Sequence, residues 1–206
     1  MQNSRRYSTD YRARYTTKLL HDTLVQMLRE MPMEKISISA LCTRAKISRS
    51  TFYMHYSSTQ ELLQEIEDIV FQYFKSYVNK GLQSEERRMD VSNVLFMSLR
   101  EKRTDYPYMF LLFHSRELED RVAEYIKNIL VELCVQTGQL SQIEAELWAI
   151  NRIGGTFAII KHFHERDFAD YEMVNAFFHK LRQHDASLLD TSKLNKQMKR
   201  NISLSE

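Results

Sequence analysis

Apolar residues recur along most of the chain at the three- and four-residue spacing of amphipathic helices, and no stretch alternates in the manner of a strand. The predicted helices cover about 10–31, 37–45, 48–56, 58–81, 85–102, 107–115, 116–137, 141–166 and 170–189. The pattern therefore predicts an all-α fold of about nine helices.

Several boundaries carry their own signals. Ser58 with Glu61, and Ser141 with Glu144, have the Ser-x-x-Glu spacing of a capping box, and Gly138 suits a helix end. Pro32 ends the first helix, because proline has no N–H to continue the ladder. Asp170 is a suitable cap for the last helix.

Composition supports the helical interpretation. The 206 residues include only four Gly and two Pro, so little interrupts a helix. Hydrophobic residues make up 43% and charged residues 27%, which excludes wholesale disorder and allows a sizeable core.

Residues 37–56 have the spacing of two short helices that share one apolar interior. Ser37 caps the first helix, Lys46 and Ile47 turn the chain, and Ser48 caps the second. The inward residues are Ile38, Leu41, Cys42, Ala45, Ile47 and Phe52. This arrangement is typical of a helix-turn-helix.

The outward face of the second short helix is polar and aromatic. It carries Arg49, Ser50, Thr51, Tyr53 and His55, whereas a merely solvated helix would more often carry Glu and Lys. Such side chains are short enough to work against a DNA groove.

Charge is divided unevenly along the chain. Residues 1–60 hold ten Lys and Arg against four Asp and Glu, whereas residues 61–190 hold fifteen against twenty-two. The basic first part indicates contact with a polyanion, although a solvated charged face gives the same count.

Residues 10–66 resemble the DNA-binding domain of the TetR family of bacterial transcriptional regulators. The strongest match, Ser48 to Tyr56, is similar to the recognition helix of that family, with its Ser-x-x-Thr-Phe-Tyr-x-His-Phe/Tyr pattern. The resemblance implies that Arg49, Ser50 and Thr51 approach base edges. It also implies that Tyr53 and His55 hold phosphates, with Ser58 and Thr59 offering backbone N–H groups to another phosphate.

Three positions depart from the family pattern. Lys46 stands where Gly is common at the turn, Thr59 where a phosphate-binding Lys is usual, and Ala40 where an acidic residue often completes a capping box. The positive charge of Lys46 is a candidate replacement for the phosphate-binding charge that Thr59 does not supply. The predicted DNA-binding residues are Ser37, Lys46, Ser48, Arg49, Ser50, Thr51, Tyr53, His55, Ser58 and Thr59.

These features predict four parts: a flexible basic arm over 1–9, the helix-turn-helix domain over 10–57, a helical regulatory and dimerisation domain over 58–190, and a disordered basic tail over 191–206. The helix over 58–80 connects the two domains.

The resemblance implies that the larger domain binds a ligand and forms a homodimer through its last two helices. Gly154 and Gly155 in mid-helix suit a close approach there, or a packing notch within one subunit, and Phe177 and Phe178 complete the predicted interface. The segment from Ile159 to His164 is similar to a branch of the family that includes dihydroxyacetone-kinase coactivators. The predicted effector-pocket residues, which could equally fill a core, are Phe74, Phe96, Met97, Tyr108, Met109, Phe113, Trp148 and Phe157.

Other classes of function have little support. Cys42 and Cys134 lie in apolar helical patterns, which favours buried thiols in a reducing cytoplasm. No apolar run approaches the roughly 20 residues needed to span a bilayer. His162 and His164 are two residues apart on a helix, so a metal site is not expected, and neither a cofactor nor a catalytic centre is predicted.

The sequence thus predicts a cytoplasmic regulator that binds double-stranded DNA as a homodimer, represses transcription from a palindromic operator and is released by a small-molecule effector. The alternative is a coactivator whose larger domain binds a metabolic enzyme or another protein.

Overall fold

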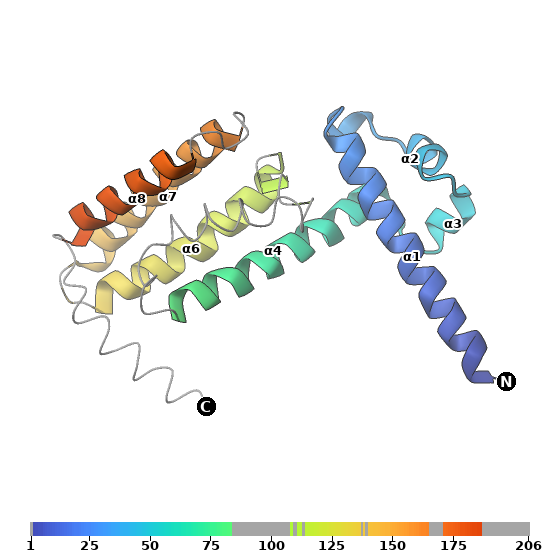
Figure 1. Cartoon of the computed structure of the whole chain (residues 1–206), viewed down its shortest axis with the longest axis horizontal. Helices are drawn as coiled ribbons and strands as arrows, with labels where there is room; N and C mark the ends of the chain where they lie inside the picture. The colour runs from blue at the N-terminus through green and yellow to red at the C-terminus, as the bar shows by residue number, and fades with distance from the viewer. Residues whose placement is uncertain are drawn as a thin grey trace. The chain divides into compact units, whose positions relative to one another are not determined.

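The computed structural model describes residues 2–83, 108, 111–112, 114–136, 138, 140–164 and 171–186. In this part of the chain the regular elements are seven α-helices and a short 3-10 helix (Figure 1), which confirms the all-α prediction. The helix predicted over 85–102 and the predicted tail over 191–206 lie outside the described residues. The chain divides into two compact units, Met1–Val70 and Phe71–Glu206.

The first unit contains α1 (Gln2–Leu28), the 3-10 helix η1 (Met33–Lys35), α2 (Ile38–Ala45), α3 (Arg49–Tyr53) and the start of α4 (Thr59–Gln83). The helix α1 begins at Gln2 rather than near Asp10, so residues predicted as an arm are helical. Neither Gly nor Pro occurs before Pro32, which leaves nothing in this stretch to break the helix.

One apolar core joins the helices of the first unit. Its fully buried side chains come from every α-helix of the unit and are Leu20, Leu24, Leu41, Phe52, Leu62 and Ile66. Burial of each such side chain contributes about 1.5–3 kcal/mol, so this core, rather than helix propensity, holds the two short helices in place.

The turn between α2 and α3 has the predicted geometry. Ser37 accepts a hydrogen bond from the Ala40 N–H at 3.1 Å, and Ser48 accepts one from the Thr51 N–H at 3.0 Å, so both serines cap their helices. Lys46 ends α2 in the left-handed conformation (φ 55°, ψ 40°), and its N–H donates back to the carbonyl groups of α2.

The predicted capping box at the start of α4 is closed differently from expectation. Ser58 accepts from the Glu61 N–H at 3.1 Å, as a cap should. The Glu61 carboxylate, however, accepts from the N–H of Ser57 at 2.7 Å and from the Ser57 hydroxyl at 2.5 Å. Two serines precede the helix, so Ser58 provides the cap while Ser57 gives the carboxylate two donors.

The second unit contains the rest of α4, followed by α6 (Arg116–Gln136), α7 (Gln142–His164) and α8 (Tyr171–Ala186). Gly138 follows α6 with φ 70°, as predicted for a helix end. The box at Ser141 forms as predicted, since Glu144 accepts from the Ser141 N–H at 2.8 Å and its own N–H donates to the Ser141 hydroxyl at 3.4 Å.

The helices α6 and α7 pack against each other through apolar residues spaced mainly four apart. The buried members are Leu118, Val122, Ile126, Leu130 and Cys134 on α6, and Ala145, Ala149, Ile153, Phe157 and Ile160 on α7. Tyr125 joins α6 to α4, because its hydroxyl donates to the Asn79 side chain at 2.8 Å and its ring meets Phe71 and Phe74 edge-on.

Cys42 and Cys134 are free, buried thiols, as predicted. Within the described ranges, no helix combines the length and the apolar character that crossing a bilayer requires.

The left-handed Lys46 generates a stability prediction. A side chain in this conformation costs about 1 kcal/mol or more, which Gly does not incur. We therefore expect Lys46→Gly to raise the free energy of unfolding of the first unit by about 1 kcal/mol in urea titrations. Lys35→Gly, at an exposed position with ordinary backbone geometry, is the control and should lower it.

Candidate nucleic-acid interface

The helix α3 has one buried and one open side. Phe52 is fully buried, whereas Arg49 and Ser50 are exposed and the Tyr53 side chain is 52% exposed. Thr51 is half-buried at the edge of the open side. The residues predicted for base edges and phosphates thus share the surface of one short helix.

Three hydroxyl groups interact at the start of this helix. The Ser48 oxygen lies 2.7 Å from the Ser50 oxygen and 2.8 Å from the Thr51 oxygen, while it also accepts the Thr51 N–H. The cap therefore fixes the side chains of Ser50 and Thr51 next to the open face. To meet a base, either hydroxyl must rotate its hydrogen or exchange its serine partner for the base.

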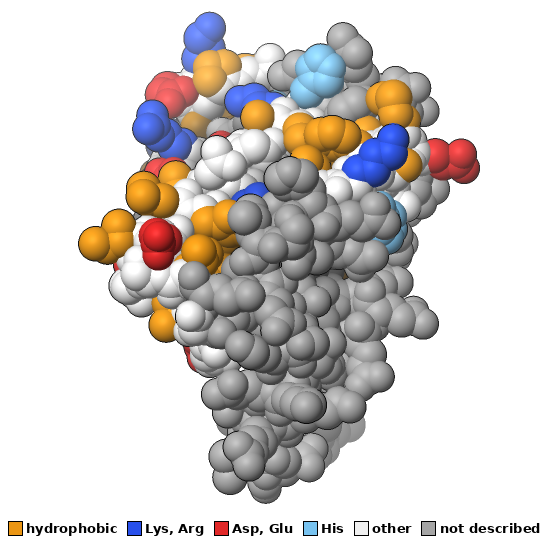
Figure 2. All heavy atoms as spheres, turned by 90° about the vertical axis from the view of Figure 1, so that its left-hand side faces the viewer, with side chains coloured by type: hydrophobic (Ala, Val, Ile, Leu, Met, Phe, Trp, Pro, Cys, Tyr) orange, Lys and Arg blue, Asp and Glu red, His pale blue; other side chains and the backbone are white. Residues whose placement is uncertain are grey.

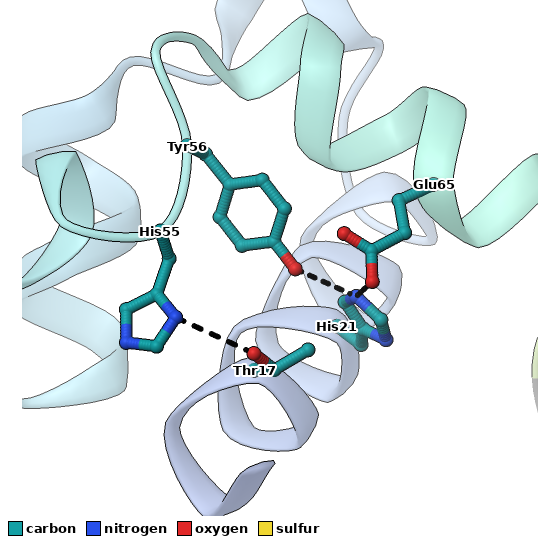
Figure 3. Close-up of polar contacts among 5 residues, drawn as sticks. All are labelled: Thr17, His21, His55, Tyr56 and Glu65. Atoms are coloured by element: carbon teal, nitrogen blue, oxygen red, sulfur yellow. Dashed lines mark hydrogen bonds and ion pairs between the residues drawn. The ribbon is translucent and has the colours of Figure 1, made fainter. Parts of the chain in front are cut away.

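His55 follows α3 and is half-buried. Its Nδ1 lies 3.5 Å from the Thr17 hydroxyl of α1, at the long end of the hydrogen-bonding range. Figure 3 shows the other ring nitrogen on the side away from Thr17. The contact with α1 thus orients the ring, and it leaves one nitrogen directed away from the helix that holds it.

The next residue, Tyr56, is buried, and its hydroxyl lies 3.1 Å from Nε2 of the buried His21 on α1. That nitrogen is also 3.6 Å from a carboxylate oxygen of Glu65 on α4 (Figure 3). Burial raises the pKa of Tyr56 strongly, and a hydrogen bond to Glu65 raises it further. Burial lowers the pKa of His21, against the opposing effect of Glu65 and Asp22.

The remaining predicted DNA-binding residues lie around the same unit. Ser37 and Lys46 are exposed, and Ser58 and Thr59 are half-buried at the start of α4. The Glu61 carboxylate lies at that helix start, and its hydrogen bonds to Ser57 hold its pKa below the usual range. A negative charge at this place disfavours a phosphate, so Ser58 and Thr59 are the weakest members of the predicted set.

Sequence reasoning missed the groups that hold the helix-turn-helix to its neighbours. The Arg44 guanidinium donates to both carboxylate oxygens of Glu30, each at 2.5 Å, and so joins α2 to the end of α1. Thr17, His21 and Glu65 were missed as well. Their partners lie far along the chain, and no local spacing marks them.

The candidates in the second unit have mixed placements. Phe74 and Phe157 are buried, and Trp148 and Tyr108 are half-buried, whereas Phe96, Met97, Met109 and Phe113 lie outside the described residues. Among the predicted interface residues, Phe177 is 45% exposed but Phe178 is fully buried in its own unit. Phe178 is therefore a core residue, because adjacent residues on a helix point in different directions.

The buried His21 generates a pH prediction. Because its pKa in the folded chain is lowered from 6.5, the unfolded chain takes up a proton first as the pH falls. The contribution of neutral His21 to the free energy of unfolding is fully present above about pH 6.5 and is lost as the pH falls below that value. Urea titrations at pH 7.5, 6 and 5 should show this loss in the first unit, and a smaller loss in His21→Gln. An equal loss in both proteins would contradict the prediction, and His114→Gln serves as the exposed control.

The fold described above also occurs in solved structures of other proteins. The solved structures that share the fold include the following two. The fatty acid degradation regulator FadR from Bacillus halodurans aligns with a TM-score of 0.58 and 15% identity over 80% of this chain and 93% of its own. DhaS, described as a dihydroxyacetone kinase operon activator, aligns with a TM-score of 0.53 and 19% identity over 84% of this chain and 97% of its own.

No curated protein matches the sequence. Residues 20–66 match the model of the bacterial regulatory proteins of the tetR family. This segment includes the last nine residues of α1, both short helices and the start of α4. The helix-turn-helix unit of this chain therefore has the sequence pattern of the bacterial regulatory proteins of the tetR family.

Proposed function

We propose that the chain is a cytoplasmic repressor that binds a palindromic operator as a homodimer and leaves it when a small molecule binds the second unit. The observation that carries the proposal is the open face of α3, where Arg49, Ser50 and Tyr53 are exposed on a helix fixed by its cap and by Phe52. Side chains of this kind on a rigid helix suit direct readout in the major groove.

A second copy of the unit is needed for tight binding, because one helix-turn-helix contacts only a half-site. The second unit offers a surface for this. Exposed large apolar side chains form a row along α7, at Ile143, Leu147 and Ile150, and α8 carries two more at Met173 and Phe177. Figure 2 shows hydrophobic side chains gathered between charged ones on one face of this unit. Such a patch suits an isologous helical interface.

The glycines of α7 support this assignment. Gly154 lies eleven residues after Ile143, which places it on the same side of the helix as the apolar row. A Cβ added at Gly154 or Gly155 would meet nothing within 4 Å in the part of the chain that the structure describes. Among the described residues nothing fills these positions, so close approach of a partner helix accounts for them better than a packing notch within one subunit.

The effector would bind among the aromatic residues of the second unit. Phe74 supports this assignment because it lies on α4, the helix that also contributes Leu62 and Ile66 to the core of the DNA-binding unit. A ligand that displaced Phe74 would thus act on a helix shared by both units, whereas Trp148 and Phe157 lie on α7.

The alternative is a coactivator that binds a metabolic enzyme or another protein. The similarity to DhaS, an operon activator by its description, favours it over the repressor in this one respect. A reporter gene behind the selected operator distinguishes the two. Deletion of the regulator should raise expression if it represses and lower expression if it activates.

The open face of α3 generates a binding prediction. Thr51→Ala and Arg49→Gln should each weaken binding to a selected operator by about 5- to 100-fold, because each removes a contact to base edges. Fluorescence anisotropy at fixed salt measures the change. The matched control is Lys35→Gln, which removes the same charge from an exposed position on η1. Tight binding by both α3 variants would refute the assigned reading face.

The apolar row generates a prediction on assembly. Leu147→Glu combined with Ile150→Glu should convert the dimer into monomers in sedimentation equilibrium, because four charges would be buried in the paired interface. Asn128→Glu, at an exposed position on α6, should leave the dimer intact. A dimer that survived the double change would exclude this surface.

The smaller change Gly154→Ala distinguishes a closely packed helix–helix interface from non-specific hydrophobic association. Alanine should stabilise the isolated helix by up to about 1 kcal/mol, yet weaken the dimer if a partner backbone lies against this position.

A further inference from the structure

The end of the recognition helix is attached to α1 at two points. His55 meets Thr17 at 3.5 Å, and the next residue, Tyr56, meets His21 at 3.1 Å. Thr17 and His21 are four residues apart, so they lie one turn apart on the same side of α1 (Figure 3). A single attachment would let the helix pivot, whereas two attachments one turn apart fix its direction along α1.

A third group joins the cluster from α4. The Glu65 carboxylate lies 3.6 Å from His21 Nε2, and it also raises the pKa of Tyr56. The hydroxyl has one hydrogen to donate, and the carboxylate can only accept. Nε2 of His21 lies within reach of both groups, 3.1 Å from the Tyr56 hydroxyl and 3.6 Å from the Glu65 carboxylate. One buried imidazole on α1 thus contacts both α4 and the segment that follows α3.

This attachment matters because α3 has only five residues, Arg49–Tyr53. A helix of this length has too few internal hydrogen bonds to hold its own direction. Its first turn is fixed by the Ser48 cap and its middle by the buried Phe52. The hydroxyl of Tyr56 fixes the far end.

We propose that Tyr56, with His21 and Glu65, forms a set of positioning residues that aims the recognition helix at the bases, so that the cluster determines sequence specificity without touching DNA. The inference rests on the proposed DNA-binding function. A positioning role differs from a purely structural one because it affects sequence-specific binding and leaves non-specific binding unchanged. Base contacts depend on the direction of the helix, whereas non-specific binding depends on surface charge, and removing the buried Tyr56 hydroxyl leaves the surface charge unchanged.

The decisive variant is Tyr56→Phe, which removes one oxygen and keeps the ring in the core. Its affinity for the selected operator should fall by about 5- to 10-fold, the factor expected for one buried hydrogen bond, while its affinity for a random duplex stays that of the wild type. Both affinities are measured by fluorescence anisotropy at the same salt concentration, well below the unfolding temperature.

The matched control is Thr23→Val. Thr23 is equally buried on α1, but its hydroxyl donates to the Leu19 carbonyl within the same helix at 2.7 Å. This change removes a buried hydrogen bond from the same unit without loosening α3. It should lower the unfolding temperature, as Tyr56→Phe does, and leave the ratio of operator to random binding unchanged.

A pair of variants at His21 provides a second readout. His21→Gln keeps an N–H donor near the position of Nε2, whereas His21→Leu removes it. His21→Gln should retain most of the preference for the operator, and His21→Leu should lose it as Tyr56→Phe does.

Three results would overturn the inference. The first is an unchanged operator-to-random ratio in Tyr56→Phe, and the second is a fall in that ratio no larger than in Thr23→Val. The third is equal behaviour of the two His21 variants. A wild-type protein without preference for any sequence would instead refute the proposed function, and the inference with it.

Discussion

The five-residue helix α3 must be held from outside, and most of the amino-terminal unit serves that requirement. Its own hydrogen bonds close barely one turn, so the Ser48 cap, the buried Phe52 and the polar cluster at Tyr56 supply the order that the helix lacks. The arrangement has a functional advantage. A short helix held at its ends exposes nearly all of its remaining surface to a groove.

Much of this unit could be predicted from sequence because its determinants are local. Ser37 and Ser48 announce caps by their position before an apolar run, and Lys46 marks the turn because α2 has to end before Ser48. The inward side of both helices follows from a three- and four-residue spacing. These signals involve residues close together in the chain, so they can be recognised from the sequence alone.

What could not be predicted depends on contacts between distant segments. No sequence pattern near His21 predicts its contact with Tyr56, and none predicts the ion pair between Glu30 and Arg44. The same limit applies to Phe177 and Phe178, where helical periodicity alone does not say which of two adjacent rings faces the core. Two serines precede α4, and the sequence does not say which of them donates hydrogen bonds to Glu61. In the structure the Glu61 carboxylate accepts them from Ser57.

The bidentate pair between Arg44 and Glu30 changes how the basic character of the amino-terminal third should be understood. The formal excess of cations there includes Arg44, but its guanidinium is already matched by a carboxylate of the same unit. The electrostatic potential that steers the protein towards a duplex therefore comes from the other cations, notably the exposed Lys46 and Arg49 beside the reading face. The direction of approach is thereby biased towards the recognition helix before any base is met.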